Sequence, residues 1–248
     1  MATEVLVIDY TTIVQEITLT ATANPQRARF MSLMTDINTA GRNLDKFDAE
    51  AIDSLSPFAS EALDYVVAMN NRKDVQIQDY NIAIAKIREV FNAVFSHGKH
   101  FIMTAHLQSE SDAITGRGRV VPQVWGKSLP SDIPKAFSEV FLTQTISNPK
   151  APNGTDYLWL TRPDGFVNFL GSRLRDDLAR VIPQNFEELS KEGKRIRSLV
   201  VGESHTGKTR SIGTLPGRVV MYALEPDGWE SLRVPFKVVK PPLAEVWK

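Results

Sequence analysis

The sequence predicts an α/β fold in which helices cover both faces of a mostly parallel sheet that carries an antiparallel extension. Three observations support this prediction. Apolar runs of strand length alternate with helix-length segments in the first part of the chain. Short apolar segments separated by turn residues follow them. An apolar run near the carboxyl end leads into a loop with a phosphate-binding pattern.

Composition places few limits on function. The chain has 248 residues, 42% hydrophobic and 23% charged, which is enough for one α/β domain over residues 1–248. Lys+Arg and Asp+Glu number 29 each, so any nucleic-acid contact must be local. There is no cysteine, which excludes disulfides and thiolate metal sites. We find no signal peptide and no apolar run of membrane-spanning length, and expect a cytoplasmic protein, of an ordinary or of a phage-infected host cell.

The first part of the chain contains the expected buried strands. Nearly continuous apolar runs predict strands over residues 4–9, 47–53 and 100–106. Helices are expected over residues 24–41, 54–69 and 77–95. Glu50 departs from the pattern, because a charge inside a buried strand is costly without a partner. His97 and His100 are expected at the surface, because two histidines without nearby acids make a poor metal site.

The second part of the chain is less regular. Glycines and small polar residues predict a mobile loop over residues 108–127. Turn residues separate expected strands at 138–146, 156–162 and 166–170, and short helices are expected at 176–181 and 185–189. A polar connector, residues 190–195, precedes a strand at 196–201. A helix at 210–215, strands at 218–224 and 234–239, and an irregular tail from residue 240 complete the chain.

The most specific motif is GESHTGKT, Gly202–Thr209, which fits the Walker A pattern of a phosphate-binding loop. Its two glycines would let the backbone wrap a phosphate, with N–H groups directed at the anion. Lys208 would contact the terminal phosphates of ATP, and the Thr209 hydroxyl would ligate Mg²⁺. A glycine-containing turn before an ordinary helix is the alternative. The expected nucleotide contacts, with Glu203 and His205 contributing backbone only, are Gly202, Glu203, Ser204, His205, Thr206, Gly207, Lys208, Thr209 and Arg210.

Several strands end in acidic or polar residues. Ligands of open α/β sheets bind at the carboxyl ends of the strands. The residues at those ends are Asp9, Asp53, His106, Gln108 and Glu225.

These features together resemble a known family. The phosphate loop, with the strands that end in Asp53-Ser54, His106-Leu107-Gln108 and Glu225, resembles the RecA-like P-loop ATPases. It is most similar to small AAA-type ATPases of bacteriophages, some of which are tied to recombination and single-strand annealing. The resemblance implies a three-layer RecA-like fold, ATP hydrolysis with Mg²⁺, a homo-oligomer and action on DNA.

The order of the elements differs from that family. In the family the phosphate-loop strand comes first, and the glutamate strand and the Mg²⁺-aspartate strand follow it. Here that order appears only when residues 191–248 are read before residues 1–190. The chain therefore resembles a circularly permuted member, with the phosphate-loop and glutamate strands in 191–248 and the aspartate and sensor strands in 1–190.

The resemblance implies roles for two acids. Asp53 would hold Mg²⁺ through water; Asp9 fits the bare pattern of apolar residues and an acid better, but Asp53 fits the family order. Glu225 would be the general base that activates the attacking water. The alternative for Glu225 is an acid that belongs only to a Pro-Asp-Gly turn.

It also implies roles for polar residues nearby. His106 and Gln108 would sense the γ-phosphate, although a histidine at a strand end is often merely hydrogen-bonded. Arg173, near a predicted hairpin, would neutralise transition-state charge in its own subunit or in a neighbouring one. A solvated helix start explains Arg173 equally well.

In such proteins a loop after the sensor strand binds single-stranded DNA, and residues 108–127 occupy that place. Phosphate contacts would come from Arg117, Arg119 and Lys127, and Trp125 would stack on a base. A flexible surface loop is the alternative. Two other functions share the phosphate loop. One is a P-loop kinase, but a kinase lid carries clustered arginines and residues 108–127 have only two. The other is a scaffold that binds nucleotide without turnover.

Overall fold

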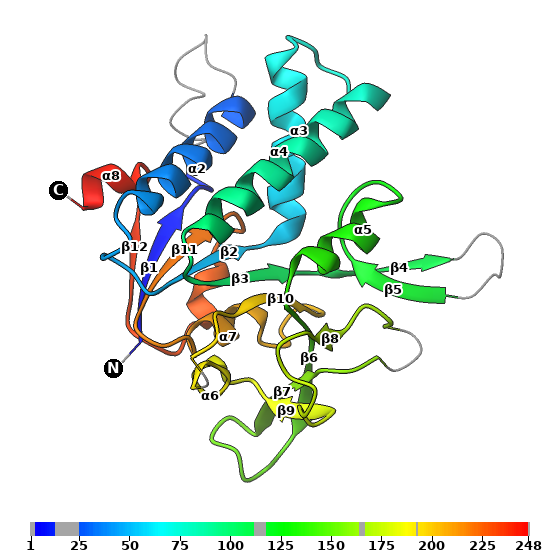
Figure 1. The fold of residues 1–248 in the computed structure, drawn as a ribbon, viewed down its shortest axis with the longest axis vertical. Coiled ribbons are helices and arrows are strands. Elements are labelled where there is room, and N and C mark those ends of the chain that lie inside the picture. The colour runs from blue at the N-terminus through cyan, green and yellow to red at the C-terminus, as the bar shows by residue number, and fades with distance from the viewer. Residues whose placement is uncertain (1–2, 13–24, 112–117, 164–166, 192, 248) are drawn as a thin grey trace.

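A ten-stranded sheet forms the centre of the computed structural model, which describes residues 3–12, 25–111, 118–163, 167–191 and 193–247 (Figure 1). The order of the strands across it is β12-β1-β11-β2-β3-β10-β6-β7-β9, and β8 pairs with β6. Neighbouring strands from β12 to β6 are parallel. The pairs that β6 makes with β7 and β8, and β7 with β9, are antiparallel. The predicted α/β class and the antiparallel extension are therefore both present.

The strands of this sheet are β1 (Glu4–Asp9), β2 (Ala49–Asp53), β3 (His100–Ala105), β6 (Glu139–Ser147), β7 (Thr155–Leu160), β8 (Gly171–Ser172), β9 (Val181–Pro183), β10 (Arg197–Val201), β11 (Arg218–Ala223) and β12 (Phe236–Val239). A separate hairpin consists of β4 (Leu107–Ser111) and β5 (Gly118–Pro122). The helices are α2 (Pro25–Gly41), α3 (Leu55–Met69), α4 (Ile77–Ser96), α5 (Leu129–Asp132), α6 (Phe186–Ser190), α7 (Lys208–Ile212) and α8 (Leu243–Val246), with 3₁₀ turns η1 (Ile133–Ala136) and η2 (Gly228–Ser231).

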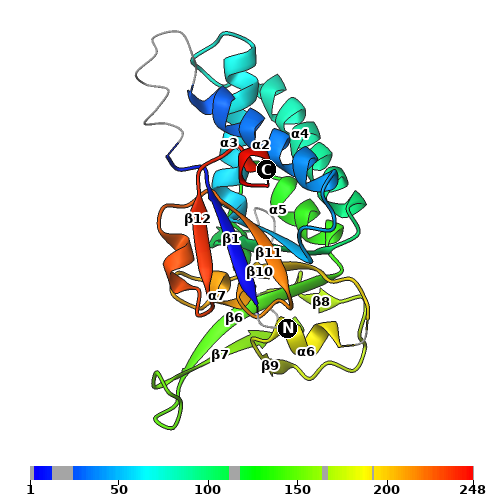
Figure 2. The ribbon, with the colours of Figure 1, turned by 90° about the vertical axis from the view of Figure 1, so that its left-hand side faces the viewer.

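Each face of the sheet is covered by its own apolar core. Alternate residues of a strand point to opposite faces, so Val220 and Tyr222 of β11 lie in one core while Val219 and Met221 lie in the other. The first core includes α2, α3 and α4, and the second includes α6 and α7. The result is a three-layer arrangement, with the long helices α2, α3 and α4 on one face together with the short α5 and α8, and α6 and α7 on the other (Figures 1 and 2).

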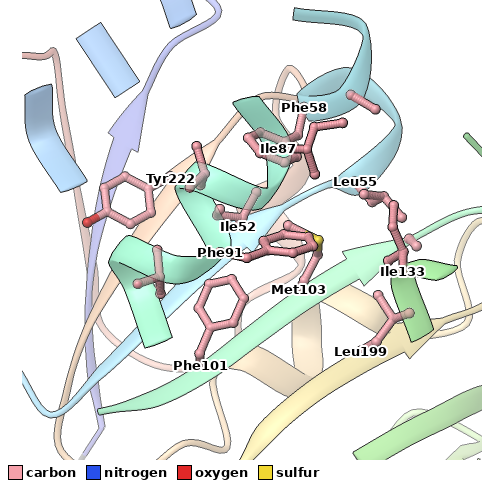
Figure 3. Close-up of a cluster of buried hydrophobic side chains, with 14 of the residues drawn as sticks. Ile52, Leu55, Phe58, Ile87, Phe91, Phe101, Met103, Ile133, Leu199 and Tyr222 are labelled. Atoms are coloured by element: carbon pink, nitrogen blue, oxygen red, sulfur yellow. The ribbon is translucent and has the colours of Figure 1, made fainter. Parts of the chain in front are cut away.

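The first core shows why α4 packs where it does. Phe91 of α4 lies over Ile52 of β2 and Met103 of β3 (Figure 3), and Phe91 is 5% exposed. Burial of one such aromatic side chain contributes on the order of 2 kcal/mol. This packing holds β2 and β3 side by side, and both strands lead into the candidate site.

Three predictions of local structure are wrong. The tail from residue 240, expected to be irregular, contains α8. Residues 176–181 do not form a helix, because neighbouring side chains take their carbonyl groups: Arg162 donates to Asp176 O and Leu178 O at 3.0 and 2.9 Å. The chain then enters β9 at residue 181. Residues 167–170 are irregular instead of a strand, and residues 164–166 lie outside the described part.

The segment 108–127 is more ordered than expected from its composition. Its described residues include most of the β4–β5 hairpin, which projects from the body of the protein (Figure 1). Residues 112–117 lie outside the described part.

The buried charge of Glu50 has partners that the sequence did not reveal. Glu50 accepts hydrogen bonds from His97 Nδ1 and from the Tyr222 hydroxyl, each at 2.7 Å. The expectation that His97 lies at the surface is wrong, because its side chain is only 7% exposed. His100 is half-buried, so it lies only partly at the surface. Within the described residues, no helix has the length and apolar character needed to cross a membrane.

Candidate functional site

The phosphate-loop motif connects β10 to α7 at the carboxyl end of the parallel strands. Gly207 has φ +90°, a left-handed conformation that favours glycine. Gly202 is required for a different reason: a Cβ there would lie 1.8 Å from Thr143 Oγ1. The loop therefore lies tightly against β6, and its backbone has the turn that a phosphate cradle needs.

Lys208, the first residue of α7, is 7% exposed. Its Nζ donates to Glu203 O at 2.9 Å, across the loop, and lies 3.5 Å from His106 Nδ1. Burial lowers the pKa of the Lys208 ammonium, although the nearby Asp53 and Glu225 carboxylates oppose this effect. The ammonium is thus held at the loop with carboxylates close by.

Thr209 and Asp53 come together from distant parts of the chain. Thr209 Oγ1 donates to Asp53 Oδ2 at 2.9 Å, and the Thr104 hydroxyl donates to Asp53 Oδ1. Burial raises the pKa of Asp53 above its ordinary 3.8. The Thr104 bond opposes that shift and the Glu225 charge adds to it. Asp9 lies beyond β11 and accepts from Thr11 N and Oγ1 at 2.9 and 2.6 Å, so its geometry does not match the Mg²⁺ role.

Glu225 faces the same pocket from the end of β11. Its Oε1 accepts hydrogen bonds from the Ser54 hydroxyl and from His106 Nε2, the latter at 3.0 Å. His106 thus carries its proton on Nε2, and Nδ1 is the atom turned to Lys208. Burial raises the pKa of Glu225, but the bonds from His106 and Ser54 outweigh it and leave the pKa below its ordinary 4.5.

These side chains border a pocket of about 520 Å³. It is lined by His106, Tyr157, Ser204, His205, Gly207, Lys208, Thr209, Arg210, Glu225, Asp227, Gly228, Glu230, Ser231 and Arg233. Asp53 lies behind this surface, where a Cβ on Gly228 would be 3.0 Å from Asp53 Oδ2. The phosphate loop, His106 and Glu225 therefore meet in one cavity.

Two residues predicted for catalysis are not part of this cavity. The Gln108 amide donates to Val124 O at 3.3 Å and to Glu110 Oε1 at 3.1 Å, within the hairpin region. Arg173 lies at the amino end of β6, where it donates to Lys135 O at 2.9 Å. The cavity opens at the other end of the strands, so Arg173 does not reach it within the same chain.

Two of the residues predicted to bind DNA, Arg119 and Trp125, are engaged in other contacts. Arg119 is paired with Glu110 at 2.8 Å. Trp125 is half-buried, donates to Ala59 O at 2.9 Å and contacts the Tyr80 ring edge-on at 5.2 Å. Lys127 is exposed, and Arg117 lies outside the described residues. The ring of Trp125 is therefore occupied by packing.

Sequence reasoning missed a second layer of contacts around the phosphate loop. Gln184 Nε2 donates to Thr206 O at 3.0 Å, and Thr143 Oγ1 donates to Val201 O at 3.2 Å. The Arg210 guanidinium lies 4.3 Å from the centre of the Tyr157 ring. These partners come from the antiparallel extension, and nothing in their local sequence links them to the loop.

The site has the donors that ATP and Mg²⁺ require. Loop amides, a buried ammonium and a threonine hydroxyl beside a carboxylate fit a Mg²⁺-bound triphosphate. Among the described residues, no group of three or more acids and histidines could hold a metal ion alone. Comparisons with protein-family models, curated proteins and solved structures found no significant match.

Proposed function

We propose that this protein is a Mg²⁺-dependent ATPase of the RecA-like P-loop type. One observation carries the proposal: the Walker A threonine, Thr209, is hydrogen-bonded to Asp53 at the end of β2. The strand between the two, β3, ends beside His106, which contacts Glu225. An ordinary glycine turn does not explain why a threonine, a buried carboxylate and a second acid converge beside it.

The residues would share the work of nucleotide binding. A pocket of about 520 Å³ is within the range of small-ligand sites. The amides of residues 204–209 and the Lys208 ammonium would hold the phosphates. Thr209 and Asp53 would hold Mg²⁺, the carboxylate through water. When bound, Mg²⁺ supplies positive charge that neutralises the phosphate oxygens.

Glu225 is suited to accept a proton from water. Its lowered pKa keeps it ionised at neutral pH. Ser54 and His106 both bind Oε1, and no described residue bonds to Oε2, which leaves one carboxylate oxygen for a water molecule. Asp53 is 2% exposed and makes contacts with Thr209 and Thr104, so it suits a metal-linked role better than a base.

A phosphate-release assay tests the proposal and separates it from its alternatives. The parent protein should release phosphate from ATP only with Mg²⁺, and Lys208→Ala should lose tight ATP binding, because the terminal phosphates lose their charge partner. A kinase would consume ATP only with an acceptor, and a scaffold would bind ATP without turnover. Turnover by Lys208→Ala at the parent rate would show that the site is misassigned.

The circular permutation is part of the proposal. Strand β1 lies between β11 and β12, so segments from both parts of the chain interleave in one sheet. In Figure 2 the strands β12 and β1 lie side by side, and α8 packs beside α2. A chain that begins at Lys191 and joins Lys248 to Met1 through a short linker should fold and hydrolyse ATP. Failure of that chain to fold would contradict the permutation.

We also propose that single-stranded DNA contacts the β4–β5 hairpin and is coupled to the pocket. The hairpin begins one residue after His106, and it projects from the sheet (Figure 1). Arg117→Ala/Arg119→Ala should weaken oligonucleotide binding and reduce its salt dependence by about two phosphate contacts, without changing ATP binding. Unchanged affinity and salt slope would contradict this role.

The remaining role of Arg173, in a neighbouring subunit, requires a homo-oligomer. Arg173→Ala should lower turnover without changing ATP binding, and mixing it with Lys208→Ala subunits should restore activity in part. If the protein is a monomer in solution and the Arg173→Ala variant is fully active, Arg173 does not have this role.

A further inference from the structure

A second pocket lies at the amino ends of β2 and β3, whose carboxyl ends lead into the candidate ATP site. It has a volume of about 410 Å³ and is lined by Asp48, Gly98, Lys99, His100, Arg195, Pro216 and Gly217. We call it the amino-end pocket. His100 begins β3, whereas His106 follows that strand, and at about 3.3 Å per residue the two histidines are on the order of 20 Å apart. The two pockets are therefore separate.

The amino-end pocket has an excess of positive charge. Neither Lys99 nor Arg195 makes an ion pair or a side-chain hydrogen bond within the described residues. The Lys99 ammonium lies 5.5 Å from the centre of the Phe47 ring. The Arg195 guanidinium lies against Gly98, where a Cβ would be 2.9 Å from its Nη1. Two cations thus border one cavity without a carboxylate partner.

The single carboxylate in the pocket is already engaged. Asp48 Oδ2 accepts from Arg218 N at 2.8 Å and lies 3.6 Å from Arg218 Nε. Asp48 therefore already faces a third cation outside the pocket lining. The lining itself holds one carboxylate, already paired, and two cations, so its charge is positive.

His100 adds a neutral donor. Its Nδ1 accepts a hydrogen bond from Ile196 N at 3.2 Å, so its proton is on Nε2. Burial lowers the pKa of His100, and the charges of Arg195 and Lys99 lower it further, against the opposite effect of Asp48. The imidazole is thus neutral near pH 7 and can donate one hydrogen bond beside the two cations.

We propose that the amino-end pocket binds a phosphate group, either free inorganic phosphate or a phosphodiester of single-stranded nucleic acid. Arginine, lysine and a histidine N–H are the side-chain donors that phosphate oxygens accept, and charge-assisted bonds of this kind are the strong ones. Both phosphate sources use the same contacts. The proposal does not depend on ATP hydrolysis at the other pocket.

The first test reads the pocket directly. The chain has 4 histidines, so the His100 ring signal in an NMR spectrum can be assigned with one His100→Gln variant. Titration of the Lys208→Ala protein with inorganic phosphate, which avoids the phosphate loop, should shift that signal. Lys99→Ala/Arg195→Ala should abolish the shift, while Lys73→Ala/Lys150→Ala, which removes two exposed lysines elsewhere, should retain it.

The second test identifies the source of the phosphate. A fluorescein-labelled oligothymidylate should bind the Lys99→Ala/Arg195→Ala protein at least about tenfold more weakly than the parent, with a salt dependence reduced by about two contacts. The Asp48→Asn protein should bind the oligonucleotide more tightly than the parent, because the negative charge of Asp48 no longer opposes the phosphate. A phosphate-induced shift with no change in oligonucleotide affinity supports a free-phosphate site. The proposal is overturned when phosphate leaves the His100 signal unmoved and the double variant binds the oligonucleotide like the parent.

Discussion

Thr209 Oγ1 donates a hydrogen bond to Asp53 Oδ2 over 2.9 Å, although 156 positions separate the two residues in the chain. The contact joins the loop that follows β10 to the end of β2, across the one intervening strand, β3. Burial raises the pKa of Asp53. A buried carboxylate whose ionised form is disfavoured lowers the stability of the folded protein at neutral pH.

Asp53→Asn should stabilise the protein without Mg²⁺ and ATP at neutral pH. The folded-state pKa of Asp53 is raised above 3.8, so its contribution to stability is present below that value and is lost as the pH rises through the folded-state pKa. Asparagine does not titrate. The melting temperature of the variant minus that of the parent should therefore increase with pH. The increase should begin near the ordinary pKa of an aspartate, about 3.9, and end at the raised folded-state pKa of Asp53.

Mg²⁺ and ATP should reverse this order, because ligands that bind only the folded state stabilise it, and the proposed function assigns Asp53 to the Mg²⁺ site. Thermal scans with and without Mg²⁺-ATP provide the check. A difference between variant and parent that is constant across pH would argue against the raised pKa.

Glu225→Gln should retain ATP binding and lose turnover by about 10² or more, as expected when a general base is removed. Glutamine Oε1 can still accept from Ser54 and His106, so the local contacts survive. Glu230→Gln, in the same pocket lining, is the matched control and should remain active. Equal loss of ATP binding and turnover in Glu225→Gln would assign Glu225 to the turn alone.

Gly202→Ala should destabilise the protein by about 1–3 kcal/mol and weaken ATP binding, because the added methyl group overlaps Thr143 Oγ1. Thr143→Ala in the same chain should restore part of the loss. Gly171→Ala, where a Cβ meets nothing within 4 Å, is the control in urea unfolding. A Gly202→Ala protein as stable as this control would contradict the close packing of the loop on β6.

His97→Ala should cost about 3 kcal/mol or more, because it leaves the fully buried Glu50 carboxylate with the Tyr222 hydroxyl as its remaining partner. Glu50→Gln in the His97→Ala background should recover part of that energy, since the unpaired charge is then gone. Urea unfolding of the two single variants and the double variant measures the coupling. Strictly additive losses would show that the two side chains do not stabilise each other.

Local sequence patterns predicted most of the elements correctly. The buried strands β1, β2 and β3 and the helices α2, α3 and α4 follow from periodicity and end signals, because these depend on neighbouring residues. The helix expected at 176–181 failed for a non-local reason, since Arg162 from another segment binds its carbonyl groups. Arg173 was expected near the site because it follows a predicted hairpin. The pairing of β8 with the amino end of β6 instead places Arg173 far from the site.

The sequence by itself determined the Gly202–Thr209 loop between β10 and α7, because a glycine, a lysine and a threonine at fixed spacing are features of one local turn of the chain. Only the tertiary structure decided which acid lies beside that loop. Asp9 and Asp53 both end apolar strands. Strand order brings Asp53 within reach of Thr209, whereas β11, β2 and β3 lie between the strand of Asp9 and β10. The tertiary structure also pairs Glu50 with His97 and places the Arg210 guanidinium over the Tyr157 ring. Strand order is set by packing between segments far apart in the chain, which no local pattern contains.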